Sequence, residues 1–114
     1  MKKLVLVVKE IQLSILKSNP PKLAITVIGV VPTSGWQNPE LVEYIYVQAP
    51  PDGIYDFDFI AEPPQGTSLQ VFTPITVSHV WDGKIEDIKG VRIHFSKGKI
   101  EQMLVNAKNI EFNV

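Results

Sequence analysis

The segment 54–60, which reads IYDFDFI, constrains the fold of this chain more than any other stretch. Its central residues alternate between aromatic and acidic: Tyr55, Asp56, Phe57, Asp58 and Phe59. Because successive side chains of a strand point to opposite faces, an extended backbone here places all the rings on one side and both carboxylates on the other. The segment therefore predicts a strand with one buried face and one solvated face.

Prolines divide the rest of the chain into segments of similar length. The nine prolines include three adjacent pairs: Pro20-Pro21, Pro50-Pro51 and Pro63-Pro64. A proline has no N–H group to give to a strand ladder, so these pairs mark strand boundaries or edges. Between them, apolar and polar alternation predicts strands at about 4–16, 22–31, 42–49, 54–61, 67–81, 90–96, 99–105 and 109–114.

Irregular features are expected in three of these strands. In the first, the buried phase passes from even to odd positions, so we expect a bulge or a bend at Lys9-Glu10. Pro74 interrupts the run 67–81 and implies an edge strand or a kink. After Gly90, the alternation predicts a hairpin that turns at Lys97-Gly98. Its inward side chains would be those of Val91, Ile93 and Phe95.

Many short strands separated by proline-marked and glycine-marked turns are typical of an antiparallel two-sheet sandwich. We therefore predict a single all-β domain over residues 1–114, immunoglobulin-like, with seven or eight strands. One alternative is a small β-barrel. The other is an α+β fold with one short helix near residues 99–108, where the apolar residues also fit the spacing of an amphipathic helix: Ile100, Met103, Leu104 and Ala107.

The charge composition argues against polyanionic partners. The formal net charge is −1, and the basic residues are ten lysines and the single Arg92. Nucleic acids and anionic membranes are bound by a concentrated positive face, so neither partner is expected. Because cysteine is absent, the chain offers no disulfide, thiolate nucleophile or cysteine-based metal site. We predict no cofactor.

The N-terminal residues and the absence of long apolar runs predict a cytoplasmic protein. Lys2 and Lys3 precede the apolar run Leu4–Val8, but these five residues are shorter than the apolar core of a secretory signal. No run in the sequence approaches the length of a membrane span.

The acidic face of the predicted 54–61 strand is a candidate metal site. Asp56 and Asp58 share this face and Asp52 lies in the adjoining turn, so together they could present oxygen ligands to Ca²⁺. The spacing lacks the glycine and the distal glutamate of a known calcium loop, and solvated acids are common on an open strand face. We therefore predict no metal here. The same reasoning applies to a second acidic cluster: Asp82, Glu86 and Asp87.

Neither histidine completes a catalytic set. Ser78 and His79 are adjacent, and adjacent strand residues point to opposite faces, so they cannot form the hydrogen bond that activates a nucleophile. We expect His79 to be partly buried and to bind a neighbouring carbonyl oxygen. His94 is expected to face outward, opposite Glu101 in the hairpin. The spacing of the histidines does not indicate a zinc site.

The loop 31–40 is the candidate recognition surface, through four residues: Thr33, Ser34, Gly35 and Trp36. Its turn would place Trp36 at one end of the sandwich, where a tryptophan can anchor a partner. In the alternative that we favour, Trp36 folds back and plugs the end of the core, because an exposed tryptophan is costly in a soluble monomer.

The sequence PTSGW, from Pro32 to Trp36, resembles the Pro-Thr-Thr-Gly-aromatic loop of chagasin-like inhibitors of cysteine proteases. Those inhibitors are immunoglobulin-like sandwiches that insert three end loops into the protease cleft. The resemblance covers these five residues. The family's glycine-rich second loop and Arg-Pro-Trp third loop have no counterparts, because Arg92 precedes Ile93 and Trp81 precedes Asp82. Membership of the family is therefore not inferred.

These observations predict a non-catalytic binding or accessory module that presents end loops or a sheet edge to a protein partner. A homodimer through a sheet edge fits the same pattern. The first alternative is a calcium-dependent or zinc-dependent carbohydrate-binding domain, or a hydrolase, that uses Asp56 and Asp58 with Tyr44 or Tyr46 nearby. The second alternative is a protease inhibitor that inserts its loops into the protease cleft.

Overall fold

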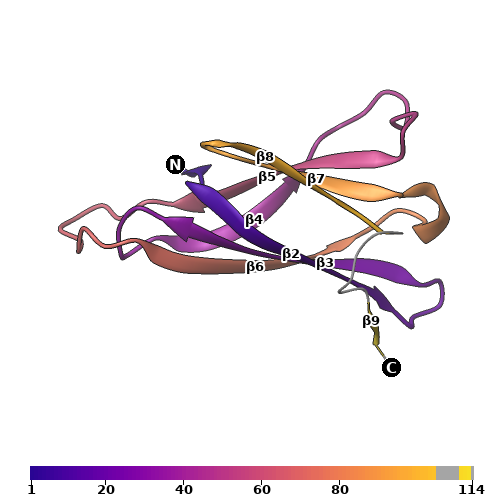
Figure 1. The fold of residues 1–114 in the computed structure, drawn as a ribbon, viewed down its shortest axis with the longest axis horizontal. Coiled ribbons are helices and arrows are strands. Elements are labelled where there is room, and N and C mark those ends of the chain that lie inside the picture. The colour runs from indigo at the N-terminus through magenta and orange to yellow at the C-terminus, as the bar shows by residue number, and fades with distance from the viewer. Residues whose placement is uncertain (105–110, 114) are drawn as a thin grey trace.

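A computed structural model describes residues 1–104 and 111–113. Their regular elements are β1 (Lys3–Leu4), β2 (Val7–Leu16), β3 (Lys22–Val31), β4 (Gln37–Glu43), β5 (Ile54–Glu62), β6 (Thr73–Trp81), the 3₁₀ helix η1 (Ile85–Asp87), β7 (Gly90–Phe95), β8 (Gly98–Met103) and β9 (Glu111–Asn113). The strands form two sheets that pack on each other (Figure 1), which confirms the predicted all-β sandwich.

The first sheet, called sheet A, is built around β5. Phe57 pairs with residues of both β4 and β7, and Ile60 pairs with residues of both β4 and β1. Therefore β4 occupies one edge of β5, whereas β7 and β1 share the other edge, and β8 pairs with β7. Sheet B has the strand order β6-β3-β2-β9. Two pairs, β5 with β7 and β2 with β9, are parallel, a departure from the purely antiparallel arrangement that was expected.

The core lies between the two sheets and is made of alternate residues from their strands. In β3, every second residue from Leu23 to Val31 is buried, and in β5 the buried residues are Phe57, Phe59 and Ala61. The expected bulge is present, because the register of β2 against β3 shifts between Val8 and Glu10. This extra residue lets apolar side chains on both sides of the shift reach the core.

Three of the predicted strands have different bounds. The strand expected at 4–16 is two strands, β1 in sheet A and β2 in sheet B. The strand expected at 42–49 overlaps only the end of β4, which runs from Gln37 to Glu43, and the one expected at 67–81 begins only at Thr73. The alternation of apolar residues in 67–72 instead belongs to a loop whose apolar side chains are exposed. The 99–108 segment is a strand over the part that β8 covers. Residues 105–108 of that prediction lie outside the described residues.

The β7–β8 hairpin turns one residue earlier than expected. Phe95 pairs with Gly98, so the two turn residues are Ser96 and Lys97. The N–H of Ser96 donates to the carbonyl oxygen of Val5 at 2.8 Å, and that of Lys97 donates to Leu6 at 3.2 Å. These bonds to the β1–β2 connection fix a register that the hairpin sequence does not specify by itself. Val91 and Ile93 face inward as predicted.

Candidate functional site

The candidate recognition loop lies at one end of the sandwich. The loops 32–36 and 63–72, the turn of the β7–β8 hairpin and the N-terminus all gather at this end (Figure 1). We call it the loop end. The loop 44–53, which precedes β5, lies at the opposite end from the loop 63–72, which follows β5.

Hydrogen bonds within and between the two loops give the recognition loop a defined shape. The N–H of Ser34 donates to the carbonyl oxygen of Leu69 at 3.1 Å, and the N–H of Leu69 donates to the Ser34 hydroxyl at 2.9 Å. Gly35 adopts a φ of 87°, a left-handed conformation that a glycine allows without strain. These contacts hold the predicted residues Thr33 to Trp36 in a single folded unit with the loop 63–72.

Trp36 is partly buried and packs against the core, as the plug alternative predicts. Its indole N–H donates to the Thr33 hydroxyl at 3.1 Å, which satisfies its only polar atom within the loop. Trp36 therefore forms part of a wall rather than a free anchor.

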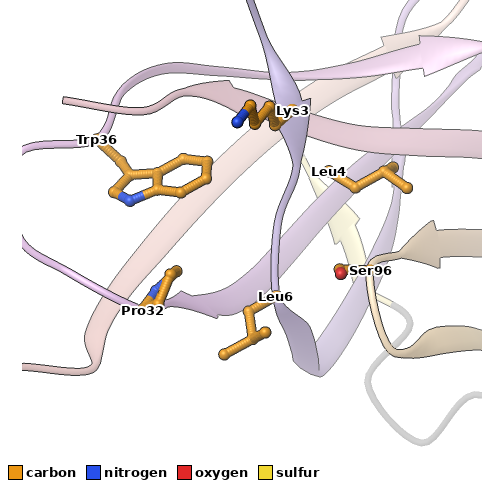
Figure 2. A pocket seen from close by; sticks show the side chains of 6 residues that line it. All are labelled: Lys3, Leu4, Leu6, Pro32, Trp36 and Ser96. Carbon is orange, nitrogen blue, oxygen red and sulfur yellow. The ribbon is translucent and has the colours of Figure 1, made fainter. Parts of the chain in front are cut away.

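An open hollow of about 410 Å³ lies beside Trp36. Its lining is mostly apolar and comes from three parts of the loop end: Lys3, Leu4, Leu6, Pro32, Trp36 and Ser96. Figure 2 shows Trp36 and Pro32 on one side of the hollow and Leu4 and Ser96 on the other. Such a hollow can accept an apolar side chain, with the Lys3 ammonium group at its rim.

Three exposed apolar residues lie on the loop 63–72, at the same end of the sandwich. The exposed fractions are 70% for Leu69, 52% for Val71 and 70% for Phe72. Because Thr73 pairs with Val31, Phe72 follows the sheet to a position beside Pro32. Sequence analysis missed these residues because their alternation was read as a buried strand face. Together with the hollow they form the loop-end surface: Leu4, Leu6, Pro32, Trp36, Leu69, Val71 and Phe72.

The acidic face of β5 carries a network centred on Asp56. The Asp56 carboxylate accepts hydrogen bonds from Arg92 at 3.1 Å, from His94 Nε2 at 2.7 Å and from the Tyr46 hydroxyl at 2.8 Å. The Arg92 guanidinium also binds Glu101, at 2.8 Å. Tyr46 lies beside Asp56, as expected. The sequence did not place Arg92 and Glu101 there, because they lie far along the chain on β7 and β8.

Asp58 joins this network indirectly, through Tyr44, whereas Asp52 has a different role. The Tyr44 hydroxyl donates to Asp58 at 3.0 Å, and the Tyr44 ring stacks on His94 with 5.0 Å between centroids. The Asp52 carboxylate accepts the N–H of Ile54 and closes the turn before β5. Among the described residues, no group of three or more histidine, cysteine or acidic side chains could hold a metal ion.

The network shifts the pKa values of its members. Burial would raise the pKa of Asp56, but the hydrogen bonds from His94, Tyr46 and Arg92 outweigh burial and lower it below its usual 3.8. Burial, followed by the hydrogen bond to Asp58, raises the pKa of Tyr44 to about 12. Burial also raises the pKa of Tyr46. The face therefore holds a carboxylate and two neutral phenols at neutral pH.

His79 joins the two sheets. It lies on β6 of sheet B, half-buried, and its Nε2 is 2.6 Å from the carboxylate of Glu43 on β4 of sheet A. The prediction that His79 binds a carbonyl oxygen is thus wrong. Strand β4 lies opposite β6 at this side of the sandwich and places the carboxylate of Glu43 beside the ring. His94 faces Lys99 rather than Glu101, a consequence of the earlier hairpin turn.

On the acidic face the described polar side chains of Asp56, Asp58, Tyr44, Tyr46, Arg92 and His94 are engaged with one another. The apolar loop-end surface is the better candidate for binding. Among the described residues, no helix has the length and apolar character required to cross a membrane. No protein-family model matches the sequence, and neither a curated protein nor a solved structure shows significant similarity to it.

Proposed function

We propose that this protein is a non-catalytic binding module that holds a protein partner at the loop-end surface. The observation that carries the proposal is an apolar hollow beside Trp36 at the same end of the sandwich as the exposed side chains of Leu69, Val71 and Phe72. Exposed apolar side chains that gather on one part of a protein surface mark interaction sites. Burial of one such side chain by a partner would contribute about 1.5–3 kcal/mol.

The partner expected at this surface is a protein segment with apolar side chains. The lining of the hollow offers few hydrogen-bonding groups, which does not suit a sugar or a nucleotide. The cytoplasm remains the predicted location of this interaction.

Site-specific photo-crosslinking tests the proposal. Phe72→p-benzoylphenylalanine should crosslink to a second protein in cells of the source organism. Ile45→p-benzoylphenylalanine is the matched control, because Ile45 is 99% exposed and lies on the loop at the opposite end. Adding Leu69→Ser to the Phe72 variant should lower capture about tenfold, since the exposed Leu69 can change without unfolding the protein. Equal capture from both positions, or capture unaffected by Leu69→Ser, contradicts the proposal.

Inhibition of a papain-like cysteine protease is a second candidate. It is favoured by the position of the 32–36 loop, beside the loop 63–72 and the β7–β8 hairpin at the same end. Titration of papain with the protein tests it directly. Full papain activity at an excess of the protein would remove this candidate and leave the binding proposal intact.

A further inference from the structure

Strand β6 is an open edge of sheet B. It pairs with β3 along its whole length, from Thr73 opposite Val31 to Trp81 opposite Leu23. Among the described residues, no strand pairs with its other side. An open edge exposes a row of unpaired N–H and C=O groups, and natural sheets usually protect such edges with charges, prolines or bulges.

Three other strands with an open side, β4, β8 and β2, carry these protections. In β4 the register shifts between Gln37 and Glu40, and Pro39 lies within the shift. Strand β8 is short and carries Lys99 and Glu101. Strand β2 has the bulge beside Lys9, and β9 covers its C-terminal end. Each of these edges would resist pairing with another strand.

Strand β6 lacks most of the charges, prolines and bulges that protect an open edge. Its nine residues, TPITVSHVW, contain no lysine, arginine or acid, and its register with β3 has no shift. Its one proline, Pro74, lies near the start of the strand. Since a proline cannot donate to β3, the backbone groups of residue 74 point to the open side. Backbone groups alternate along a strand, so Thr76, Ser78 and Val80 also turn theirs to the open side.

The side chains around this edge are compatible with a close neighbour. Thr76, Ser78 and Val80 are exposed on the outer face of sheet B and carry no charge. The Ser78 hydroxyl lies 3.0 Å from the Thr26 hydroxyl of β3, which holds it back on its own sheet. Val80 is 50% exposed and would lose water contact beside an added strand.

We propose that β6 pairs antiparallel with β6 of a second copy of this chain, around a two-fold axis near Ser78. In such an interface each open N–H meets a carbonyl of the identical strand, so one uncharged edge is complementary to itself. When a strand pairs with its own copy, any charged residue near the axis faces a charge of the same sign and is repelled. Strands β4 and β8 carry such residues, whereas β6 has no lysine, arginine or acidic residue. The product is a continuous sheet made from both copies of sheet B.

The dimer should be weak, because one strand pair buries less surface than the roughly 1,200 Å² of a standard interface. We therefore expect self-association that depends on protein concentration. This interface lies on β6 and not at the loop-end surface, so the two proposals succeed or fail independently.

Sedimentation velocity from about 10 μM to about 1 mM tests the dimer. Ser78→Lys places like charges on both sides of the axis and should weaken association at least about tenfold. Gln12→Lys is the control, because Gln12 pairs with Thr26 on the same outer face, two strands from the edge, and the charge change is the same. A wild-type monomer throughout, or equal weakening by both variants, overturns the proposal.

A spin label gives the geometry without disturbing β6. The chain has no cysteine, so Gln12→Cys provides a single attachment site. With strands about 4.8 Å apart, the two copies of residue 12 in a continuous sheet should lie about 25 Å apart between backbones. A pulsed-dipolar distance near this value, lost when Ser78→Lys is added, supports the β6 interface. A dimer with a clearly different distance contradicts it.

Discussion

Asp56 is surrounded by donors because two side chains of the neighbouring strand β7 and one side chain of the loop before β5 converge on its carboxylate. In the parallel register of β5 and β7, Asp56 lies opposite Arg92 and Asp58 lies opposite His94. The Tyr46 hydroxyl both accepts the N–H of Asp56 and donates to its carboxylate, each at 2.8 Å. It thus occupies the edge of β5 where β4 has already ended. A side chain replaces a strand in the ladder, which explains why the strand predicted at 42–49 stops early.

Tyr46→Phe removes this double hydrogen bond and should destabilise the protein by about 1–2 kcal/mol, because the N–H of Asp56 loses its partner. Tyr44→Phe is the control. It removes a single bond from a ring that is 40% exposed, so its loss should stay below about 1 kcal/mol. Urea denaturation followed by fluorescence measures both. Equal losses would show that Tyr46 does not complete the edge of β5.

The lowered pKa of Asp56 predicts a contribution to stability at low pH with a definite sign. The folded state favours the ionised carboxylate, so this contribution is present above the unfolded pKa, near 3.8, and is lost as the pH falls through the lower folded pKa. The free energy of unfolding, measured by urea denaturation between about pH 5 and pH 2, should therefore fall less steeply in Asp56→Asn than in the wild type. A parallel curve for Asp56→Asn contradicts the assignment.

At the scale of the elements, local patterns predicted the strands with two distinct faces. The bounds of β3 follow from an apolar run with a proline on either side, and the bulge in β2 follows from the shift in its alternation. The parallel pairing of β5 with β7 and the hairpin register depend on contacts between distant segments, which alternation does not encode. For the same reason the acidic residues of the β5 face could be named from the sequence, whereas Arg92 could not be placed beside them.

Gly29 lies where β3 is closely packed both by its neighbour β2 and by the opposite sheet. It lies on the inward face of β3, and a Cβ atom there would lie 2.6 Å from the carbonyl oxygen of Val7 and 3.1 Å from the ring of Phe59. Gly29→Ala should therefore destabilise the protein by about 1–3 kcal/mol through overpacking. Gly66→Ala is the matched control, since nothing lies within 4 Å of its Cβ position. Thermal unfolding of both variants measures this effect. Equal melting temperatures would mean that the start of β2 can move away from an added Cβ atom without loss of stability.

For the whole molecule, the side of the sandwich where β4 and β6 meet is held by a polar contact as well as by the core. The ring of His79 lies edge-on to Phe57, with 5.8 Å between centroids, while its Nε2 reaches Glu43 on the opposite sheet. This contact lies on the inner face of β6. Disturbing the contact should loosen the two sheets without affecting the strand pairs within each of them.

A double-mutant cycle with Glu43→Gln and His79→Phe measures this contact between the sheets. Since the two side chains are 39% and 28% exposed, solvent screens the pair, and we expect a coupling energy of about 0.5–1 kcal/mol. The pair Lys2 and Glu40 is the control: it is 3.0 Å apart, has similar exposed fractions of 27% and 48% and does not join the two sheets, and its coupling energy should be no larger. Hydrogen exchange distinguishes a local from a global role, because loss of the contact should speed exchange in β4 and β6 more than in β2 and β3. Uniform acceleration across all four strands would mean that the contact contributes only to global stability and does not hold this side of the sandwich closed.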